Sequence, residues 1–167
     1  ALFFVVIMLM LLPFQVTMVP NVITQRAMGL LDTIWAIILP MTVAPFYIFL
    51  LRQYMVGLPG DMIEAAQIDG AGTLRCFIHV VLPVCQPILG AAVALSFADC
   101  WNLVEQPLTY LTTHTELYPL SVVFNQLTQQ STGVEFAGAA LYTLPALLIY
   151  LYFQNDILEG VQLTELK

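Results

Sequence analysis

The sequence predicts an all-α membrane protein, a polytopic helix bundle with four transmembrane helices and one polar loop. The composition leads to this prediction. Hydrophobic residues make up 60% of the chain and charged residues 9%, against about 45–50% and about 25% in soluble domains. The 4 basic and 11 acidic residues are too few to form the polar shell of a water-soluble fold of 167 residues. Lipid is therefore an expected partner of the chain.

The same composition excludes several classes of function. Four Lys and Arg residues cannot neutralise a phosphate track, which excludes nucleic acid as a partner. The three cysteines, Cys76, Cys85 and Cys100, form no CxxC pair, so we expect neither a metal site nor a disulfide scaffold. A P-loop needs a lysine after its glycines, and the only lysine is the last residue, Lys167. We expect no enzyme, no catalytic residue and no cofactor.

Four apolar stretches are long enough to cross the hydrocarbon core of a bilayer, which takes about 20 residues. The first contains only Gln15 and Thr17 as polar residues, and the third contains a single carboxylate, Asp99. Residue 1 already lies within apolar sequence, which favours the C-terminal part of a longer protein. The four stretches cover about residues 1–19, 33–51, 87–103 and 136–154.

The basic residues predict the orientation, because cytoplasmic loops carry an excess of Lys and Arg. Arg52 and Arg75 lie in or beside the loop between the second and third stretches, and Lys167 follows the fourth. With four spans, these segments share one side. We therefore expect the loop at about 52–87 and the C-terminus to be cytoplasmic.

Small residues recur along the third stretch. Gly90, Ala94 and Ala98 are spaced at i, i+4 and i+8, which places them on one side of a helix. Such a stripe lets helix backbones approach closely in a membrane. It predicts tight packing against a neighbouring helix.

The loop at about 52–87 is too polar to span, and we expect two short helices about a glycine hinge. Pro59 suits a first helical turn, and a compact helix covers 62–68. Asp69 is expected to cap a second helix over about 72–81, which Pro83 ends. That second helix would place on one apolar face Leu74, Phe77, Ile78 and Val81.

The first short helix has one acidic face. Asp61, Glu64 and Ile68 share it at i, i+3 and i+7, and Ala65 and Ala66 leave the flank nearly bare. One interpretation is a rigid cytoplasmic knob that fits into a groove of another protein. An ordinary linker with a solvated acidic edge explains these residues equally well.

The spacing of this loop resembles the EAA signature of ABC importer permeases. Glu64-Ala65-Ala66, Gly70 and Leu82-Pro83 match it, with Val80 where isoleucine is usual and Ile63 where a second glutamate is common. Further matches resemble the carbohydrate-type branch of that family, and in the tail Glu165 stands where a small residue is frequent. They are Leu12-Pro13-Phe14-Gln15-Val16 with Pro20, Gly29-Leu30-Leu31-Asp32-Thr33, Phe49-Leu50-Leu51-Arg52-Gln53-Tyr54, Trp101-Asn102 with Pro107-Leu108, and Glu159-Gly160-Val161-Gln162-Leu163.

The resemblance implies the last four of about six spans in a permease of the bacterial inner membrane. It implies as partners two ABC ATPase subunits, a second permease subunit, an extracellular solute-binding protein and a sugar. The loop would be the coupling helix lodged in the ATPase, with Glu64 offering an ion pair and Gly70 forming the bend. The residues assigned to this coupling site are Asp61, Glu64, Ala65, Ala66, Asp69, Gly70, Leu82 and Pro83.

Polar residues near the ends of the stretches are assigned to a substrate path. Asp99, with Trp101 and Asn102 beside it, would offer a carboxylate, an indole and an amide to a sugar, and Gln15 joins them. The alternative for Asp99 is that its carboxylate reaches the outer interface or hydrogen-bonds a neighbouring helix. Two other functions stay open. One is a permease of the same superfamily for an amino acid, a peptide or an ion. The other is a fragment of a transporter driven by an ion gradient, which would favour several intramembrane ionisable groups or paired repeats.

Overall fold

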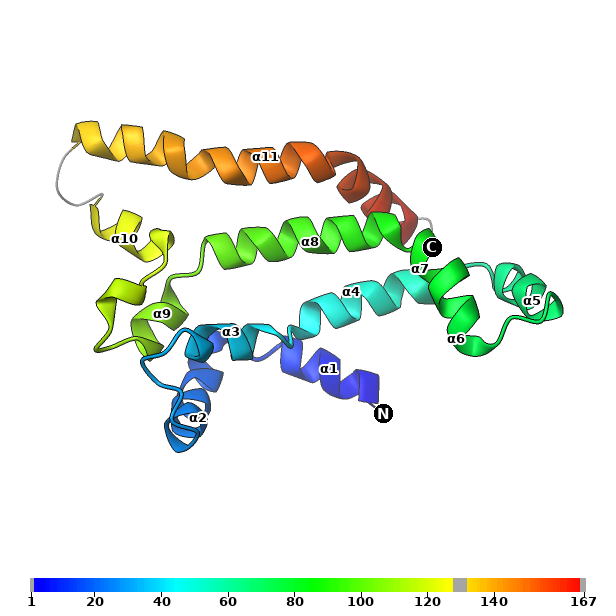
Figure 1. Cartoon of the computed structure of the whole chain (residues 1–167), viewed down its shortest axis with the longest axis horizontal. Coiled ribbons are helices and arrows are strands. Elements are labelled where there is room, and N and C mark those ends of the chain that lie inside the picture. Colours follow the sequence, from blue (N-terminus) through cyan, green and yellow to red (C-terminus); the bar gives the residue numbers. More distant parts are fainter. Residues whose placement is uncertain (1, 128–131, 166–167) are drawn as a thin grey trace. The chain divides into compact units, whose positions relative to one another are not determined.

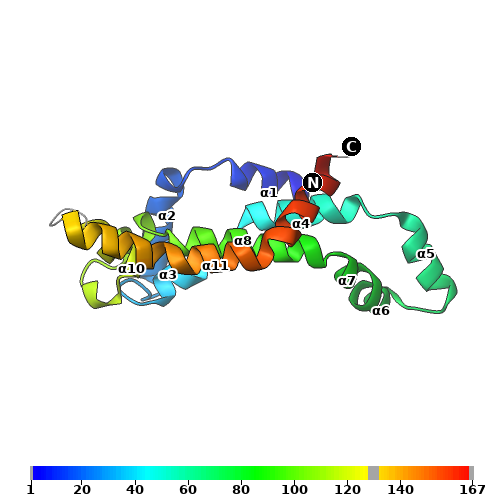
Figure 2. The same ribbon diagram turned by 90° about the horizontal axis from the view of Figure 1, so that it is seen from above.

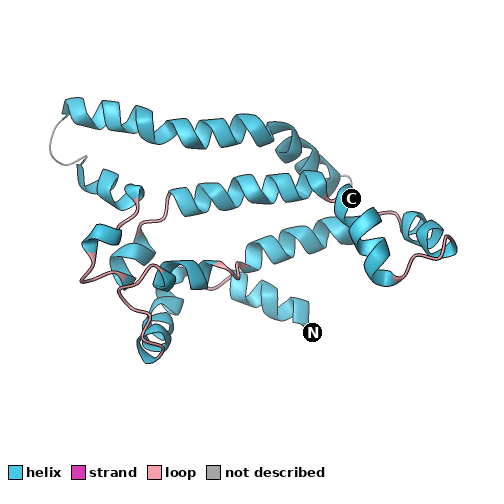
Figure 3. Cartoon of the chain, viewed as in Figure 1, coloured by secondary structure: helices cyan, strands magenta, loops and turns pink. Residues whose placement is uncertain are grey.

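The structure is a computed structural model that describes residues 2–127 and 132–165, and this part of the chain is helical without strands (Figures 1 and 3). The all-α prediction is therefore confirmed. The α-helices are α1 (Leu2–Met10), α2 (Phe14–Ala27), α3 (Trp35–Met41), α4 (Pro45–Val56), α5 (Gly60–Ile68), α6 (Thr73–Cys76), α7 (Leu82–Val84), α8 (Gln86–Trp101), α9 (Glu105–Tyr110), α10 (Leu120–Leu127) and α11 (Thr132–Glu165). A π-helical turn (Phe77–Val81) joins α6 to α7, and a 3-10 turn (Thr115–Leu117) precedes α10.

The chain divides into two compact units, each described here by itself. The first unit comprises residues 1–46 and 97–147, and the second comprises residues 47–96 and 148–167. The second unit contains α5, α6 and α7, the helices of the polar loop. The first unit contains α1, α2, α3, α9 and α10.

Two helical segments in the described residues are long and apolar enough to cross a membrane. Trp35–Val56 has 22 residues and Glu135–Gly160 has 26. Two further pairs qualify only if each bent pair counts as one span. These are α1 with α2, bent by 106°, and Thr73–Val84 with Gln86–Trp101, bent by 68°. The structure thus holds two to four candidate spans.

The first apolar stretch is divided between α1 and α2. Pro13 lies between α1 and α2 in an extended conformation, with φ −68° and ψ 154°. Proline cannot donate a backbone hydrogen bond and clashes with the preceding turn, so it ends the apolar helix here. Pro20, in contrast, lies inside α2.

The last helix extends beyond its expected end at residue 154. α11 continues to Glu165, and the candidate span within it includes Asp156 and Glu159. A helix continues wherever its backbone ladder is unbroken, whether or not the side chains remain apolar. Asp99 is therefore not the only acidic residue within a candidate span.

The core of the second unit forms where α4, α8 and α11 meet. Its buried members are Tyr54, Cys85, Ile88 and Ala91, with Ile157 of α11 packed against them. The predicted stripe is confirmed in part, since Gly90 and Ala94 are buried and Ala98 is exposed. The buried face of α8 also includes Ile88, Ala91 and Ala92.

Candidate functional site

Helix α5 ends in a complete C-terminal cap at Gly70. The N–H of Gly70 donates to the carbonyl of Gln67 at 3.0 Å, and that of Ala71 donates to the carbonyl of Ala66 at 2.9 Å. This pair of bonds is the Schellman motif, which needs a left-handed residue. Gly70 has φ +82°, as the predicted bend requires. The chain then turns from α5 into α6 (Figures 1 and 2).

The second half of the loop differs from the expectation at both of its ends. Gly72 is the residue that precedes α6, without a side-chain cap, so Asp69 does not cap this helix. Asp69 is instead the C-terminal cap residue of α5 and donates its N–H to the carbonyl of Ala65. Helical structure continues past Pro83 to Val84, so Pro83 does not end it. The reason is the π-helical turn before Pro83, in which Leu82 N–H bonds Phe77 five residues back.

The π-helical turn also changes which side chains share a face. A π turn contains more residues than an α turn, so side chains that follow it rotate relative to those before it. Leu74, Phe77 and Ile78 are exposed by 72%, 42% and 46%, whereas Val81 is half-buried. The predicted single apolar face is therefore divided between the surface and the interior.

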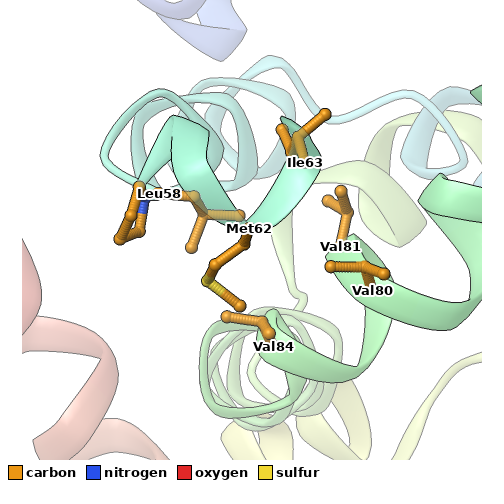
Figure 4. A pocket seen from close by; sticks show the side chains of 7 residues that line it. Leu58, Met62, Ile63, Val80, Val81 and Val84 are labelled. Carbon is orange, nitrogen blue, oxygen red and sulfur yellow. The ribbon is translucent and has the colours of Figure 1, made fainter. Parts of the chain in front are cut away.

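A small apolar cavity of about 10 Å³ lies between α5 and the helices that follow it (Figure 4). Ile63 and Met62 from α5 meet Val80, Val81 and Val84 around it. A glutamate at position 63 would place a charge against these valines, at a high desolvation cost. The isoleucine that departs from the EAA pattern thus packs α5 onto the rest of its own loop. The remaining lining residues are Leu58 and Pro59.

The residues predicted for partner contact lie mainly on the surface of this loop. Glu64 and Asp61 are exposed one turn apart on α5, and Ala65 beside them is exposed as well. Ala66 is half-buried, and its carbonyl accepts the N–H of Ala71. The other exposed members are Asp69, Gly70, Leu82 and Pro83.

The helix before the loop, α4, contacts the residues that lead from the loop into α8. The hydroxyl of Tyr54, near the end of α4, donates to the carbonyl of Val84 at 3.2 Å. Cys85 at the bend and Ile88 in α8 complete the same buried cluster. A force applied to the loop would therefore reach α4 and α8 directly, because closely packed cores do not deform continuously. The sequence match that includes Tyr54 did not predict this contact.

Trp101 and Asn102, assigned to the substrate path, contact Tyr142 of α11 within the first unit. Trp101 Nε1 donates to the carbonyl of Tyr142 at 3.1 Å, and the Tyr142 hydroxyl donates to the carbonyl of Trp101 at 2.6 Å. The same hydroxyl lies 3.2 Å from Asn102 Oδ1. The indole stacks on Phe97, and the Tyr142 ring stacks on Phe124. The structure thus places Trp101 and Asn102 in the contact between α8 and α11. The sequence did not predict the part played by Tyr142, which lies 41 residues from Trp101.

The other two path residues are exposed. Asp99 lies in the last turns of α8, two residues before Trp101. Gln15 in α2 donates through Nε2 to Glu105 Oε2 of α9 at 3.4 Å. The four assigned residues thus belong to two local groups, one at Trp101 and one at Gln15. No local sequence pattern linked Glu105 to Gln15, because 90 residues separate them.

Asp32 organises a turn that the sequence did not predict. Asp32 has a left-handed backbone, with φ 59°, and accepts the Thr113 N–H at 2.7 Å and the Thr113 hydroxyl at 3.2 Å. The hydrogen bond from the Thr113 backbone holds the pKa of Asp32 below its usual value of 3.8. Next to it, Glu116 accepts a hydrogen bond from His114 at 2.5 Å, which raises the pKa of His114 above 6.5.

Metal ligation finds no support in the described ranges, where no group of three or more His, Cys, Asp or Glu side chains gathers. The arrangement that remains is a multi-span helical membrane protein with an exposed two-helix loop. These features define the class of an integral membrane protein with an exposed loop.

The comparisons with known proteins agree with this class. Residues 1–157 match the family of binding-protein-dependent transport system inner membrane components, and the chain belongs to that family. It is 29% identical over 168 residues to the arabinooligosaccharides transport system permease protein AraQ of Bacillus subtilis (strain 168). That match covers 99% of this chain and 59% of the relative. It is also 29% identical to the lactose transport system permease protein LacG of Rhizobium radiobacter, covering 94% of this chain and 58% of the relative.

The chain thus spans about three fifths of the length of these curated relatives. The family resemblance stated from the sequence is confirmed, and members of the family are transport components and not enzymes. The carbohydrate-type branch is likewise supported by the sugar permeases among the relatives.

Proposed function

We propose that the chain is part of the permease subunit of an ATP-driven importer for a sugar or an oligosaccharide. The family membership and the sugar permeases among its relatives support the proposal. The observation that carries it is local: α5 is capped at Gly70, packed by Ile63 against its own loop, and exposes Glu64 and Ala65. A rigid helix with a free acidic face is what docking into another subunit requires.

The loop over about 52–87 is the coupling element of this proposal. Glu64 offers an ion pair to a basic residue of the ATPase, and Ala65 and Ala66 allow its surface to approach the α5 backbone. Asp61 and Asp69 add negative charge at the two ends of α5. The exposed pair Leu82 and Pro83 completes the contact surface on the second half of the loop.

The coupling loop and the C-terminus face the cytoplasm in this proposal, and the membrane is the bacterial inner membrane. Arg52 and Arg75 favour this orientation, because basic residues are retained on the cytoplasmic side. The opposite ends of the spans receive solute from an extracellular binding protein. A second permease subunit completes the path in this proposal.

The substrate path of the proposal includes Asp99, Trp101, Asn102 and Gln15. Asp99 is the member to test first, because Trp101 and Asn102 contact α11 and their replacement would also disturb that packing. Pore contact predicts that Asp99→Asn changes the apparent affinity for solute while expression is maintained. Unchanged uptake kinetics in both Asp99→Asn and Asp99→Leu would remove this residue from the path.

A permease for a different solute is the second candidate. It is favoured by one relative that is an osmoprotective compounds uptake permease, GgtD of Synechocystis, 30% identical over 166 residues. Uptake by the complete importer in proteoliposomes, screened over labelled sugars and osmoprotectants, decides between the two. Uptake that requires ATP and survives a protonophore supports an ABC importer. Uptake that the protonophore abolishes and ATP does not affect would contradict it and favour a transporter driven by an ion gradient.

A further inference from the structure

Helix α2 turns polar side chains toward the protein and an apolar side outward. On its inner side, Gln15 contacts Glu105 of α9, and Gln25 is buried and donates to the carbonyl of Ala36 at 3.0 Å. The side opposite these contacts is exposed and apolar. Its large members are Val16, Val19 and Ile23, with exposed fractions of 57%, 55% and 64%. A helix at a surface that faces water has the reverse arrangement.

The direction of α2 also differs from that of the helix before it. The axes of α1 and α2 meet at 106°, a change of direction visible in Figure 2. α1 has no polar or charged side chain, so it suits the hydrocarbon core, whereas α2 contains amides, hydroxyls and a guanidinium. A helix nearly perpendicular to a membrane-embedded one lies along the bilayer surface. There its apolar side faces the acyl chains.

A basic residue lies at the edge of this apolar side. Arg26 is exposed in the last turn of α2, and the structure gives it no ion pair among the described residues. It borders a surface hollow of about 330 Å³, together with Val22, Ile23 and Ala27. A guanidinium beside exposed apolar side chains matches the chemistry of a phospholipid, whose phosphate lies directly above its acyl chains.

We propose that α2 lies in the membrane–water interface and binds an anionic phospholipid. Arg26 donates to the phosphate oxygens, and the apolar side of α2 packs against the acyl chains. An anionic headgroup is favoured over a zwitterionic one, because no ammonium group competes with Arg26 for the phosphate. A protein surface in this place would have to supply its own carboxylate opposite Arg26, whereas every phospholipid carries a phosphate at this depth. The proposal does not rest on the proposed function, since it requires only a membrane.

The depth of α2 tests the first half of the proposal in the complete importer, reconstituted in lipid. Ile23→Cys carries a fluorescent label in a chain with Cys100→Ser, since the other two cysteines are buried. Nitroxide near the acyl carbonyl should quench this label more than nitroxide near the chain end or iodide in water. Thr115→Cys, on an exposed turn of the same unit, is the control that iodide should quench.

Three other quenching patterns at position 23 would overturn the proposal. Quenching by iodide alone would place this side of α2 in water. Quenching by neither reagent would show that a protein surface covers it. Strongest quenching by the deep nitroxide would place α2 in the hydrocarbon core and not at the interface.

The phosphate contact is tested by titrating the complete importer in detergent with phosphatidylglycerol or with phosphatidylcholine. Phosphatidylglycerol should raise the melting temperature of the wild type more, and Arg26→Gln should lose most of that difference. Arg26→Lys should keep part of it, because an ammonium attracts phosphate without binding it through two parallel bonds. Arg75→Gln is the matched control, since it removes the same charge from an exposed position in the other unit, and it should keep the full difference.

An equal response of the wild type to both lipids, or an undiminished difference in Arg26→Gln, would overturn the phospholipid site. The same increase with inorganic phosphate would overturn it as well, because the site would then bind a free anion. Neither experiment measures uptake, so an importer without ATP-dependent transport would contradict the proposed function alone.

Discussion

Gly90 of α8 and Asp156 of α11 approach so closely that no side chain fits between them. A Cβ atom added at Gly90 would lie 2.7 Å from Cγ and 2.8 Å from Cβ of Asp156. Because Cβ is fixed to the backbone, the aspartate cannot relieve the clash by rotating its far end. At Gly160, one turn further along α11, an added Cβ would meet Ile88 and Ala91 in ordinary contact.

Gly90→Ala is therefore expected to destabilise the second unit by about 1–3 kcal/mol, the usual cost of overpacking. Asp156→Gly in the same chain should reduce the loss caused by Gly90→Ala, because it removes Cβ as well as the carboxylate. Gly133→Ala is the control, since nothing lies within 4 Å of the added atom. Thermal unfolding of these variants in detergent measures the coupling. Equal destabilisation by Gly90→Ala with and without Asp156→Gly would contradict the close approach.

Gly70→Val should disrupt the end of α5 without preventing membrane insertion. The left-handed conformation at φ +82° costs an L-residue about 1–2 kcal/mol, and a β-branched side chain resists it most. We expect ATPase activity that no longer responds to solute, measured in reconstituted importer. Gly60→Ala is the control, because Gly60 lies in the same helix without a positive φ and with open space around it. Solute-stimulated ATPase activity in Gly70→Val equal to wild type would rule out a coupling role for the bend.

Glu64→Lys should weaken association with the ATPase by placing like charge against a basic partner. The side chain is exposed on α5, so the substitution leaves the internal packing intact. Co-purification of the ATPase with the tagged permease should fall several-fold and fall further at low salt, where charges are less screened. Glu116→Lys makes the same change of charge in the other unit and should not affect co-purification. If both variants retain the ATPase equally, Glu64 is not at the interface.

The orientation can be tested by labelling with an impermeant thiol reagent, but Cys76 is unsuitable because it is only 4% exposed. Ile68→Cys replaces a residue that is 85% exposed at the end of α5. In a chain with Cys76→Ala, this cysteine should be protected in intact cells and labelled after permeabilisation. The exposed Cys100, at the other end of α8, should be labelled from outside. Labelling of position 68 in intact cells would reverse the orientation and exclude cytoplasmic coupling.

The turn at Asp32 should respond to pH in two directions. The pKa of Asp32 is lowered, so its hydrogen bonds contribute above its unfolded value of about 4 and are lost as the pH falls through the lowered pKa. The pKa of His114 is raised, so its pairing with Glu116 contributes below about 6.5 and is lost as the pH rises through the raised pKa.

Hydrogen exchange of the segment 110–117, compared between variants at the same pH, separates the two groups. Glu116→Gln should speed exchange relative to wild type at about pH 6, and the effect should disappear as the pH rises through the raised pKa of His114. Asp32→Asn should speed exchange on both sides of that pKa. A Glu116→Gln variant that matches wild type at about pH 6 would show that the pair does not hold this turn.

The sequence alone determined the class of this protein, and it did so through local and compositional features. The scarcity of charge requires a membrane, and helices are the elements that satisfy their backbone bonds within lipid. The left-handed bend at Gly70 was also predictable, because a cap is formed by residues a few positions apart. The spaced pattern from Glu64 to Pro83 identified the family for the same reason.

Only the tertiary structure decided which side chains meet across the chain. The contacts of Tyr142 with Trp101, of Thr113 with Asp32 and of Asp156 with Gly90 join residues more than 40 positions apart, and no local pattern encodes them. The break at Pro13 and the continuation past Pro83 were decided in the same way. Each proline removes one donor, but the surrounding backbone determines whether the helix bends at once or widens to accommodate it.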